Sequence, residues 1–468
     1  MKHLLLALIT LPLAWSTARA ADWPQHQHDA RRSGFTREEV KPPYRVAWKH
    51  SFLPERPARR TQAIAYDKRV FVGTQQGVMH CFDAETGKEL WTFKGAGSIQ
   101  HSAACDGGMV FFGSLDGSVY AVDCRTGARR WKRQTDAPFS AAPLVARDHV
   151  YIGNHRGAFL AIRQKTGDFA WVQHIRAPVF GTAAFDDGRV FVGGEDMRLH
   201  AFDAATGRRL WRSEQLWGMS FKDYHPVVHK GHVLVRPMAS FEADIYTDRY
   251  SKYGAWPDNM PGGWRAVWGP GKWGKGFKGL YAEAEDVRAG KMPKELMDRQ
   301  LPVIEHFEKT PEDQDLFILD VKSGKQALIP PHFRVMAMHG AVTPPAEDFR
   351  GTLVVPWCHM THGWGRYDIA RNRMVELIVP PRACNADENV NVSCGGRYVY
   401  VMHCEEGNAN YTGVYDLATK TWTPIHGDVP WYDNLQSGAN PASIGYGRFY
   451  HILFYTLVAR TTQQEARR

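Results

Sequence analysis

Short apolar runs ending in glycine recur along the first half of the chain, as in Val70-Phe71-Val72-Gly73. A run of this length followed by turn residues is typical of a buried β-strand. The positions that recur lie 40 residues apart, namely Trp91, Trp131, Trp171 and Trp211, and with them Gly87, Gly127, Gly167, Gly207, Gly73, Gly113, Gly153 and Gly193. A period near 40 with one turn per strand predicts four-stranded blades of a β-propeller.

The repeating unit reads V-F-V-G-x-x-x-G-x-x-x-A-x-D-x-x-T-G-x-x-x-W, as in Val110 to Trp131. Its Asp-x-x-Thr-Gly part, for example Asp83 to Gly87, predicts a tight turn in which the Asp side chain accepts backbone hydrogen bonds and Gly takes positive φ. The Trp belongs to the outermost strand, and we expect it to pack between neighbouring blades. This interpretation makes the repeated Trp residues structural.

The unit resembles the pyrroloquinoline-quinone (PQQ) repeat, most clearly over residues 62–215, which would form four blades. Asp320 to Gly324, Tyr367-Asp368, and Tyr415-Asp416 with Trp422 resemble weaker copies. The resemblance implies an all-β, eight-bladed propeller, and the irregular spacing after residue 215 leaves seven blades as an alternative. The expected blades are 62–95, 99–135, 139–175, 179–215, 223–330, 339–379, 390–425 and 436–461. Trp48 has no blade of its own, so we expect its strand to pair with residues 451–458 and close the ring, which removes exposed sheet edges.

One long insertion, residues 239–315, interrupts the fifth blade between its second and third strands. In propellers of this type, such loops open on the face that usually carries the ligand entrance. The insertion combines aromatic rings with cations, which suits stacking on sugars and pairing with carboxylate or sulfate. Its candidate ligand-binding residues are Trp256, Trp264, Arg265, Trp268 and Trp273. The alternative is a lid that packs its own small core over the propeller.

Further polar residues are expected at the same face. The mouths of inner strands carry His101, Tyr224, His225 and His339, and His155 and Arg156 end a second strand in the third blade. We treat His101, His155, Tyr224, His225 and His339 as candidate catalytic residues. Arg156 and Trp357 are candidates for ligand binding.

Cysteine and histidine residues occur together at the ends of second strands in two adjacent blades. They are Cys358, His359 and His362 in the sixth blade, and His403 and Cys404 in the seventh. Thiolate and imidazole ligands suit zinc or another borderline-soft metal. A disulfide is an alternative, either between Cys358 and Cys404 or with Cys384 or Cys394, and so are ordinary rim residues. Cys81 and Cys105 stand at repeat positions that predict small core residues.

The first twenty residues resemble a secretory signal, with Lys2 and His3, an apolar run over 4–13, and Ala18-Arg19-Ala20 at its end. We therefore expect a single mature domain over 21–468 in the periplasm or outside the cell, without lipid or transmembrane anchor. The net charge of +9 favours anionic partners, and export makes nucleic acid an unsuitable one.

These features predict a propeller with a cleft for an anionic ligand, in the first place an acidic polysaccharide. Such a cleft suits a lyase reaction, in which a cation neutralises the uronate and Tyr or His takes the α-proton. One alternative is a non-catalytic periplasmic binding or scaffold protein, resembling the propellers that assist outer-membrane assembly. The other is a PQQ-dependent dehydrogenase. That resemblance implies quinone and calcium in the central channel. Asn389, Asn391 and Asn440, near the channel mouth, support this alternative, whereas the sequence lacks the adjacent Cys pair of many such enzymes. We therefore keep zinc or calcium as candidate cofactors and regard PQQ as disfavoured.

Overall fold

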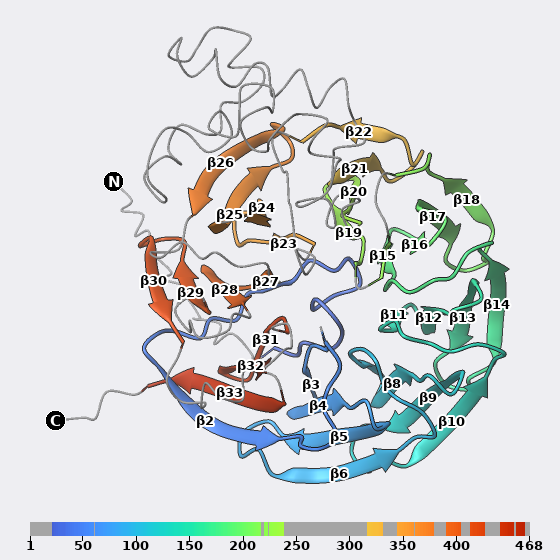
Figure 1. The fold of residues 1–468 in the computed structure, drawn as a ribbon, viewed down its shortest axis with the longest axis horizontal. Helices are drawn as coiled ribbons and strands as arrows, with labels where there is room; N and C mark the ends of the chain where they lie inside the picture. The colour runs from blue at the N-terminus through green and yellow to red at the C-terminus, as the bar shows by residue number, and fades with distance from the viewer. Residues whose placement is uncertain are drawn as a thin grey trace, which may run out of the picture.

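Eight β-sheets form a closed ring in the computed structural model (Figure 1). The structure describes residues 21–59, 61–216, 220–222, 224–237, 316–330, 344–359, 361–378, 390–403, 412–425, 440–453 and 455–463. Within these ranges all regular elements are strands, and no helix there is long and apolar enough to cross a membrane. The structure therefore confirms an all-β, eight-bladed propeller.

The first four blades follow the 40-residue repeat, and each runs from an innermost to an outermost strand. They consist of β3 (Ile64–Tyr66), β4 (Arg69–Gly73), β5 (Val78–Asp83) and β6 (Glu89–Lys94); β7 (Ala104–Asp106), β8 (Met109–Gly113), β9 (Ser118–Asp123) and β10 (Arg129–Gln134); β11 (Leu144–Ala146), β12 (His149–Gly153), β13 (Ala158–Arg163) and β14 (Phe169–His174); and β15 (Ala184–Asp186), β16 (Arg189–Gly194), β17 (Arg198–Asp203) and β18 (Arg209–Arg212).

The later blades keep this order despite their degraded repeats. They consist of β19 (Val227–His229), β20 (His232–Val235), β21 (Phe317–Asp320) and β22 (Gln326–Leu328); β23 (Ala346–Glu347), β24 (Leu353–His359), β25 (Thr361–Asp368) and β26 (Arg373–Ile378); β27 (Val390–Gly395), β28 (Tyr398–His403), β29 (Gly413–Asp416) and β30 (Thr421–Pro424); and β31 (Ser443–Gly445), β32 (Arg448–Leu453), β33 (Thr456–Thr462) and β2 (Tyr44–Ser51). The short strand β1 (Phe35–Thr36) adds to β27 in parallel.

The ring is closed by pairing the two ends of the chain. Strand β2 lies antiparallel to β33, with Trp48 opposite Ala459. The last blade therefore takes its outermost strand from the N-terminal side and its other three strands from the C-terminal side, as the unpaired Trp48 predicts. In this arrangement no blade lacks its fourth strand.

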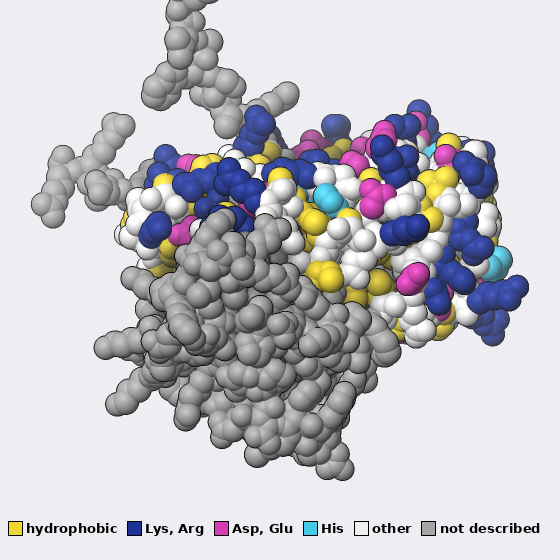
Figure 2. All heavy atoms as spheres, turned by 90° about the horizontal axis from the view of Figure 1, so that it is seen from above, with side chains coloured by type: hydrophobic (Ala, Val, Ile, Leu, Met, Phe, Trp, Pro, Cys, Tyr) yellow, Lys and Arg dark blue, Asp and Glu magenta, His cyan; other side chains and the backbone are white. Residues whose placement is uncertain are grey.

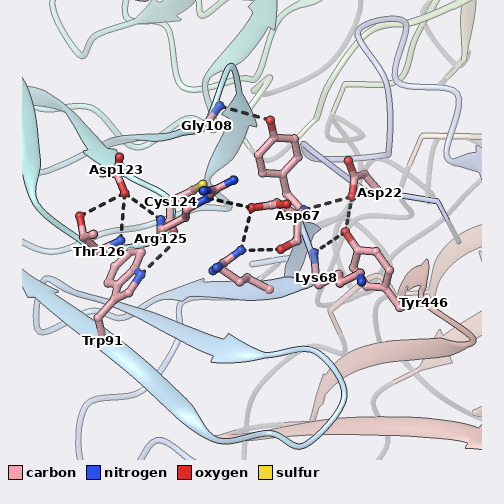
Figure 3. Close-up of polar contacts among 12 residues, drawn as sticks. Asp22, Asp67, Lys68, Trp91, Gly108, Asp123, Cys124, Arg125, Thr126 and Tyr446 are labelled. Atoms are coloured by element: carbon pink, nitrogen blue, oxygen red, sulfur yellow. Dashed lines mark hydrogen bonds and ion pairs between the residues drawn. The ribbon is translucent and has the colours of Figure 1, made fainter.

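Each repeated Trp docks on the following blade through the same contacts. The indole Nε1 donates to a backbone carbonyl of the next turn, at 3.1 Å from Trp91 to Cys124 (Figure 3). The same bond is 2.7 Å long from Trp131 to Gln164. Trp48, Trp171 and Trp211 bond in the same way to Ala84, Ala204 and Val321. Trp131 and Trp171 are buried as expected, whereas Trp91 and Trp211 are only partly buried.

The turn on which each Trp docks has the predicted chemistry. Asp123 Oδ1 accepts hydrogen bonds from the backbone N–H groups of Arg125 and Thr126 and from the Thr126 hydroxyl (Figure 3). Gly127 has a φ of 71°, and a Cβ atom there would lie 2.7 Å from the ring of Trp91. Glycine is therefore required both for its backbone conformation and for close approach of the ring.

Candidate functional site

The N-terminal residues lie inside the ring and connect its blades. We call residues 22–36 the inner segment; it runs through the middle of the ring in Figure 1. It accepts hydrogen bonds from a backbone N–H of the innermost strand in each of seven successive blades. The donors are Ala65, Cys105, Val145, Phe185, Val228, Glu347 and Cys394, and their acceptors are Trp23 O, Pro24 O, Gln25 Oε1, Ala30 O, Arg31 O, Ser33 O and Gly34 O. In the eighth blade, the N–H of Gly447 donates to the Glu38 carboxylate.

Arg32 holds the inner segment together from within. Its side chain is fully buried, and its guanidinium donates to the carbonyls of Ala183 at 2.8 Å and His26 at 2.7 Å. Further bonds reach Pro143 O and Gln25 Oε1, both at 3.3 Å. Burial lowers the pKa of Arg32 to about 9, an effect that the nearby Asp29 partly offsets. The guanidinium therefore links the inner segment to the third and fourth blades.

Three buried histidines meet next to the inner segment. His26 Nε2 lies 3.2 Å from Nδ1 of His225, and the His26 ring meets that of His101 edge to face at 4.7 Å between centroids. Ser102 Oγ lies within hydrogen-bond distance of both His26 Nδ1 and His101 Nδ1. The sequence singled out His101 and His225, and the structure brings them together. His26 was missed, because it precedes the repeats and no periodic position marks it.

Tyr224, a third candidate near an inner-strand mouth, is also buried. It lies next to the channel-facing His225, and its backbone N–H donates to Phe221 O at 3.0 Å. Neighbouring repeats place further buried polar side chains at equivalent levels, namely Thr61, Gln62, Thr182, Asn391 and Asn440. These described residues thus give the channel a polar lining of amide, hydroxyl and imidazole groups.

A pocket of about 540 Å³ lies among the loops on one face of the ring. Its lining comes from loops between successive blades and from loops between second and third strands. The described lining residues are Ala58, Arg59, Gln75, Gln100, Leu115, Ser140, His155, Phe180 and Lys222. Two of them are cations and none is an acid, so the described wall of the pocket favours anions.

His155, one of the candidate residues, is among the residues that line this pocket. Its Nε2 is 2.9 Å from Ser140 Oγ, and its ring meets Phe180 edge to face. Burial and then the charge of Lys222 lower the pKa of His155 below its ordinary value. Arg156 is the next residue, but its exposed guanidinium pairs with Asp136 at 3.0 Å on the rim. Arg156 therefore stands beside the pocket rather than among its described lining residues.

Positive charge also lies along the outer edge of the ring. Figure 2 shows Lys and Arg side chains over the visible edge, with Asp and Glu scattered among them. The outermost strands and turns of blades four and five contribute exposed Arg208, Arg209, Arg212, Lys322 and Lys325. The edge therefore adds a basic surface that is separate from the pocket.

The remaining site predictions lie outside the described residues or side chains. His339, Cys384, Asn389, Cys404 and the insertion with Trp256, Trp264, Arg265, Trp268 and Trp273 are outside the described ranges. Trp357, Cys358, His359, His362 and His403 are described as strand residues only, with Cys358 opposite His362 in the β24–β25 pair. Cys81, Cys105, Cys124 and Cys394 are free and buried. Cys394 is thus a core residue and not part of a disulfide.

The repeat is matched by the family model described as "Outer membrane protein assembly factor BamB", over residues 42–179 and 115–236. Residues 42–236 are therefore similar to PQQ-type repeats of the kind that this family model describes. No curated protein sequence matches this propeller. BamB from Moraxella catarrhalis has a similar structure, with a TM-score of 0.56 and 12% identity over 90% of this chain and 100% of that chain.

Two enzyme structures resemble this PQQ-repeat propeller to a similar degree. Quinohemoprotein alcohol dehydrogenase from Comamonas testosteroni gives a TM-score of 0.60 at 13% identity, over 95% of this chain and 81% of that one. A europium-containing methanol dehydrogenase gives 0.59 at 12% identity, over 92% and 89%. At such identities the likeness establishes the fold alone.

Three imidazoles and a guanidinium lie close together in the described part of the channel. Calcium prefers oxygen ligands with carboxylates among them, whereas His26, His101 and His225 offer ring nitrogens. The fully buried Arg32 lies beside them and donates to the carbonyl of His26. These four side chains by themselves are therefore not a calcium ligand set.

Proposed function

We propose that this protein is a non-catalytic binding propeller whose pocket holds an anionic group of a larger ligand, an acidic polysaccharide in the first place. The observation that supports this proposal is the composition of the pocket wall. Arg59 and Lys222 supply positive charge, and no described lining residue is acidic. A carboxylate or sulfate entering this pocket would be attracted by both cations.

The pocket also has the size and the hydrogen-bonding groups for a sugar unit. Its volume of about 540 Å³ lies in the range of small-molecule sites. The amides of Gln75 and Gln100 and the hydroxyl of Ser140 can bond sugar hydroxyls, and the Phe180 ring offers an apolar face. The mixture suits an acidic saccharide better than a bare inorganic anion.

The arrangement of the other candidates favours binding over β-elimination. A lyase needs a general base within reach of the α-proton of the bound uronate. His101 and His225 are instead engaged with His26 and Ser102, and Tyr224 is buried away from the described pocket lining. His155 does line the pocket, but its Nε2 is engaged with Ser140 Oγ at 2.9 Å.

A scaffold role is the second candidate, because the matching family model is named for an outer-membrane assembly factor. The basic outer edge would then meet an acidic protein surface. Both candidates share a non-catalytic binding function, and they differ in which surface matters. Substitutions in the pocket would affect saccharide binding, and substitutions of Arg209 and Arg212 would affect a protein complex.

Calorimetric titration of the full-length protein with oligouronates and with neutral oligosaccharides of equal length tests the proposal. We expect binding of the acidic series alone, and about tenfold weaker binding in Lys222→Ala and in Arg59→Ala, the size of one charge-assisted hydrogen bond. Lys88→Ala, which removes an exposed cation in the outer turn of the first blade, is the matched control. Equal binding by all three variants would disprove the pocket as the site, and release of unsaturated uronate would show a lyase instead.

A further inference from the structure

We propose that the seam between the eighth and first blades carries a divalent-metal site, with His50, His80 and Glu89 as its ligands. One ligand atom from each of the three residues lies within 4.8 Å of the others. Imidazole nitrogen and carboxylate oxygen together suit Zn²⁺ above the other common biological cations. This site lies at the outer part of the ring and is separate from the pocket.

The ligands come from two blades that only ring closure brings together. His50 belongs to β2, which completes the eighth blade, whereas His80 and Glu89 belong to β5 and β6 of the first blade. The His50 ring packs against Phe52 and Phe82, with centroids 4.9 and 4.6 Å away. These contacts hold the imidazole at the seam, on a wall that is partly apolar.

His80 is oriented in the manner of a metal-bound histidine. Its Nε2 lies 2.8 Å from Oε2 of Glu55, and its Nδ1 lies 2.7 Å from Oε1 of Glu89. Glu55 in turn accepts a hydrogen bond from the Thr74 hydroxyl at 3.1 Å. If Nε2 donates its proton to Glu55, Nδ1 is left with its lone pair toward Glu89 and His50. A carboxylate that orients a histidine through its second nitrogen is a recurring partner of zinc ligands.

The geometry requires only small movements to accept the ion. Tetrahedral ligands at about 2.1 Å from zinc are about 3.4 Å apart, so the most distant pair would approach by at most about 1.4 Å. His80 Nδ1 and Glu89 Oε1, which are 2.7 Å apart, would separate by about 0.7 Å. Glu89 is partly exposed and can rotate, while His80 is nearly buried. An open side at Glu89 leaves room for water as a fourth ligand.

Bound metal would join the two blades at the point where the ring closes. Because folding brings the three ligands together from segments on both sides of this seam, the metal would bind the folded protein and stabilise it. We therefore expect the melting temperature to rise with added Zn²⁺ in the wild type but not in variants of the ligands.

Chelator-treated full-length protein titrated with Zn²⁺, and separately with Co²⁺, tests the proposal. A Cys358→Ser/Cys404→Ser background removes thiolate binding at the other candidate metal site. In that background we expect one Co²⁺ per chain, with weak visible bands and no sulfur-to-metal charge-transfer band. His50→Gln and Glu89→Gln should abolish these bands, and Glu55→Gln should weaken binding about 10- to 100-fold.

Control variants separate this site from other histidines and acids. His174→Gln alters an exposed histidine at the outer edge of the third blade, and Glu85→Gln alters an exposed acid near the seam; both should bind metal as the background protein does. Circular dichroism should show that His50→Gln and Glu89→Gln remain folded. If the background protein binds no Zn²⁺, or if the ligand variants bind it equally well, the cluster is an ion-paired hydrogen-bond network and the proposal is wrong.

Discussion

His26 Nε2 lies 3.2 Å from Nδ1 of His225, although the two residues are 199 positions apart in the chain. They meet because the inner segment lies within the ring, where it accepts hydrogen bonds from seven innermost strands. The channel is thus organised by residues that, apart from the short strand β1, belong to no blade. Its stability and the form of its polar lining should depend on this segment.

Replacing Arg32 with Ala should destabilise the whole propeller. The buried guanidinium donates to four acceptors from three parts of the chain. The substitution would remove this donor from all four, and only Gln25 Oε1 is known to keep another, the N–H of Val145. We expect a loss of about 3–5 kcal/mol in the free energy of unfolding, measured by urea denaturation. Arg31→Ala changes an exposed neighbour and should cost less than about 0.5 kcal/mol. Equal losses in the two variants would contradict this role.

Asp29 should make the inner segment sensitive to acid. Burial alone would raise the pKa of Asp29, but hydrogen bonds from His28 and Ser33 outweigh it and hold the pKa at about 2. Because the folded-state pKa lies below the ordinary value, ionised Asp29 stabilises the fold above about pH 4, and this contribution disappears as the pH falls toward 2. Asp29→Asn should therefore cost about 2 kcal/mol at neutral pH and almost nothing near pH 2. Unfolding curves over this pH range, where wild type and variant should converge, test the prediction.

The glycine under each Trp offers a test of blade packing. A Cβ atom at Gly167 would lie 2.6 Å from the Trp131 ring, at a φ of 73°. Gly188 has a similar φ of 76°, but a Cβ there would meet no atom within 4 Å. Gly188→Ala should therefore cost only the strain of positive φ, about 1 kcal/mol, whereas Gly167→Ala should cost about 3 kcal/mol. Thermal or urea unfolding of both variants measures these losses in the free energy of unfolding. Equal losses would show that the clash with the Trp131 ring contributes nothing.

The ring and its closure could be predicted because the repeat assigns a residue type to each physical task. Gly87, Gly127, Gly167 and Gly207 stand where the backbone and the neighbouring Trp allow no side chain. Trp48 could be assigned to the last blade because an outermost strand without inner strands must pair elsewhere. Such requirements fix a residue type at a regular interval along the chain, so they can be recognised in the sequence.

The inner segment could not be predicted because it acts mainly through backbone carbonyls. Pro24, Ala30, Arg31, Ser33 and Gly34 all accept hydrogen bonds from innermost strands through main-chain oxygens, which any residue type supplies. The side chains that do contribute, Gln25 and Arg32, look like ordinary polar residues in the sequence. Their buried state follows only from the closed ring.

The site could be predicted in part. His101 and His225 do mark the inner-strand mouths, but the direction of their side chains toward His26 depends on the unpredicted segment. The pocket had a usable signal, since Gln100, Ser140 and Phe180 are spaced by 40 residues, as are Gln75, Leu115 and His155. Equivalent repeat positions from adjacent blades necessarily lie around one mouth, so unusual polar residues there indicate a binding wall.

Ligand binding in the pocket should strengthen as the pH falls. Burial and the charge of Lys222 lower the pKa of His155 below 6.5, so His155 is neutral at pH 7–8 in the free protein. A bound anion favours the protonated imidazole and raises this pKa, and by linkage protonation favours the anion. Affinity for an oligouronate should therefore increase as the pH is lowered from 8 through 6.5 to 5, a range in which the uronate stays ionised.

Two variants separate the contribution of His155 from that of other groups. His155→Gln keeps a hydrogen-bonding side chain that does not titrate, so the affinity of this variant for the oligouronate should change little over the same pH range. Arg156→Gln, on the rim and paired with Asp136, should keep the pH dependence of the wild type. Calorimetry at each pH measures both effects, and a wild-type affinity independent of pH would show that His155 does not contact the anion.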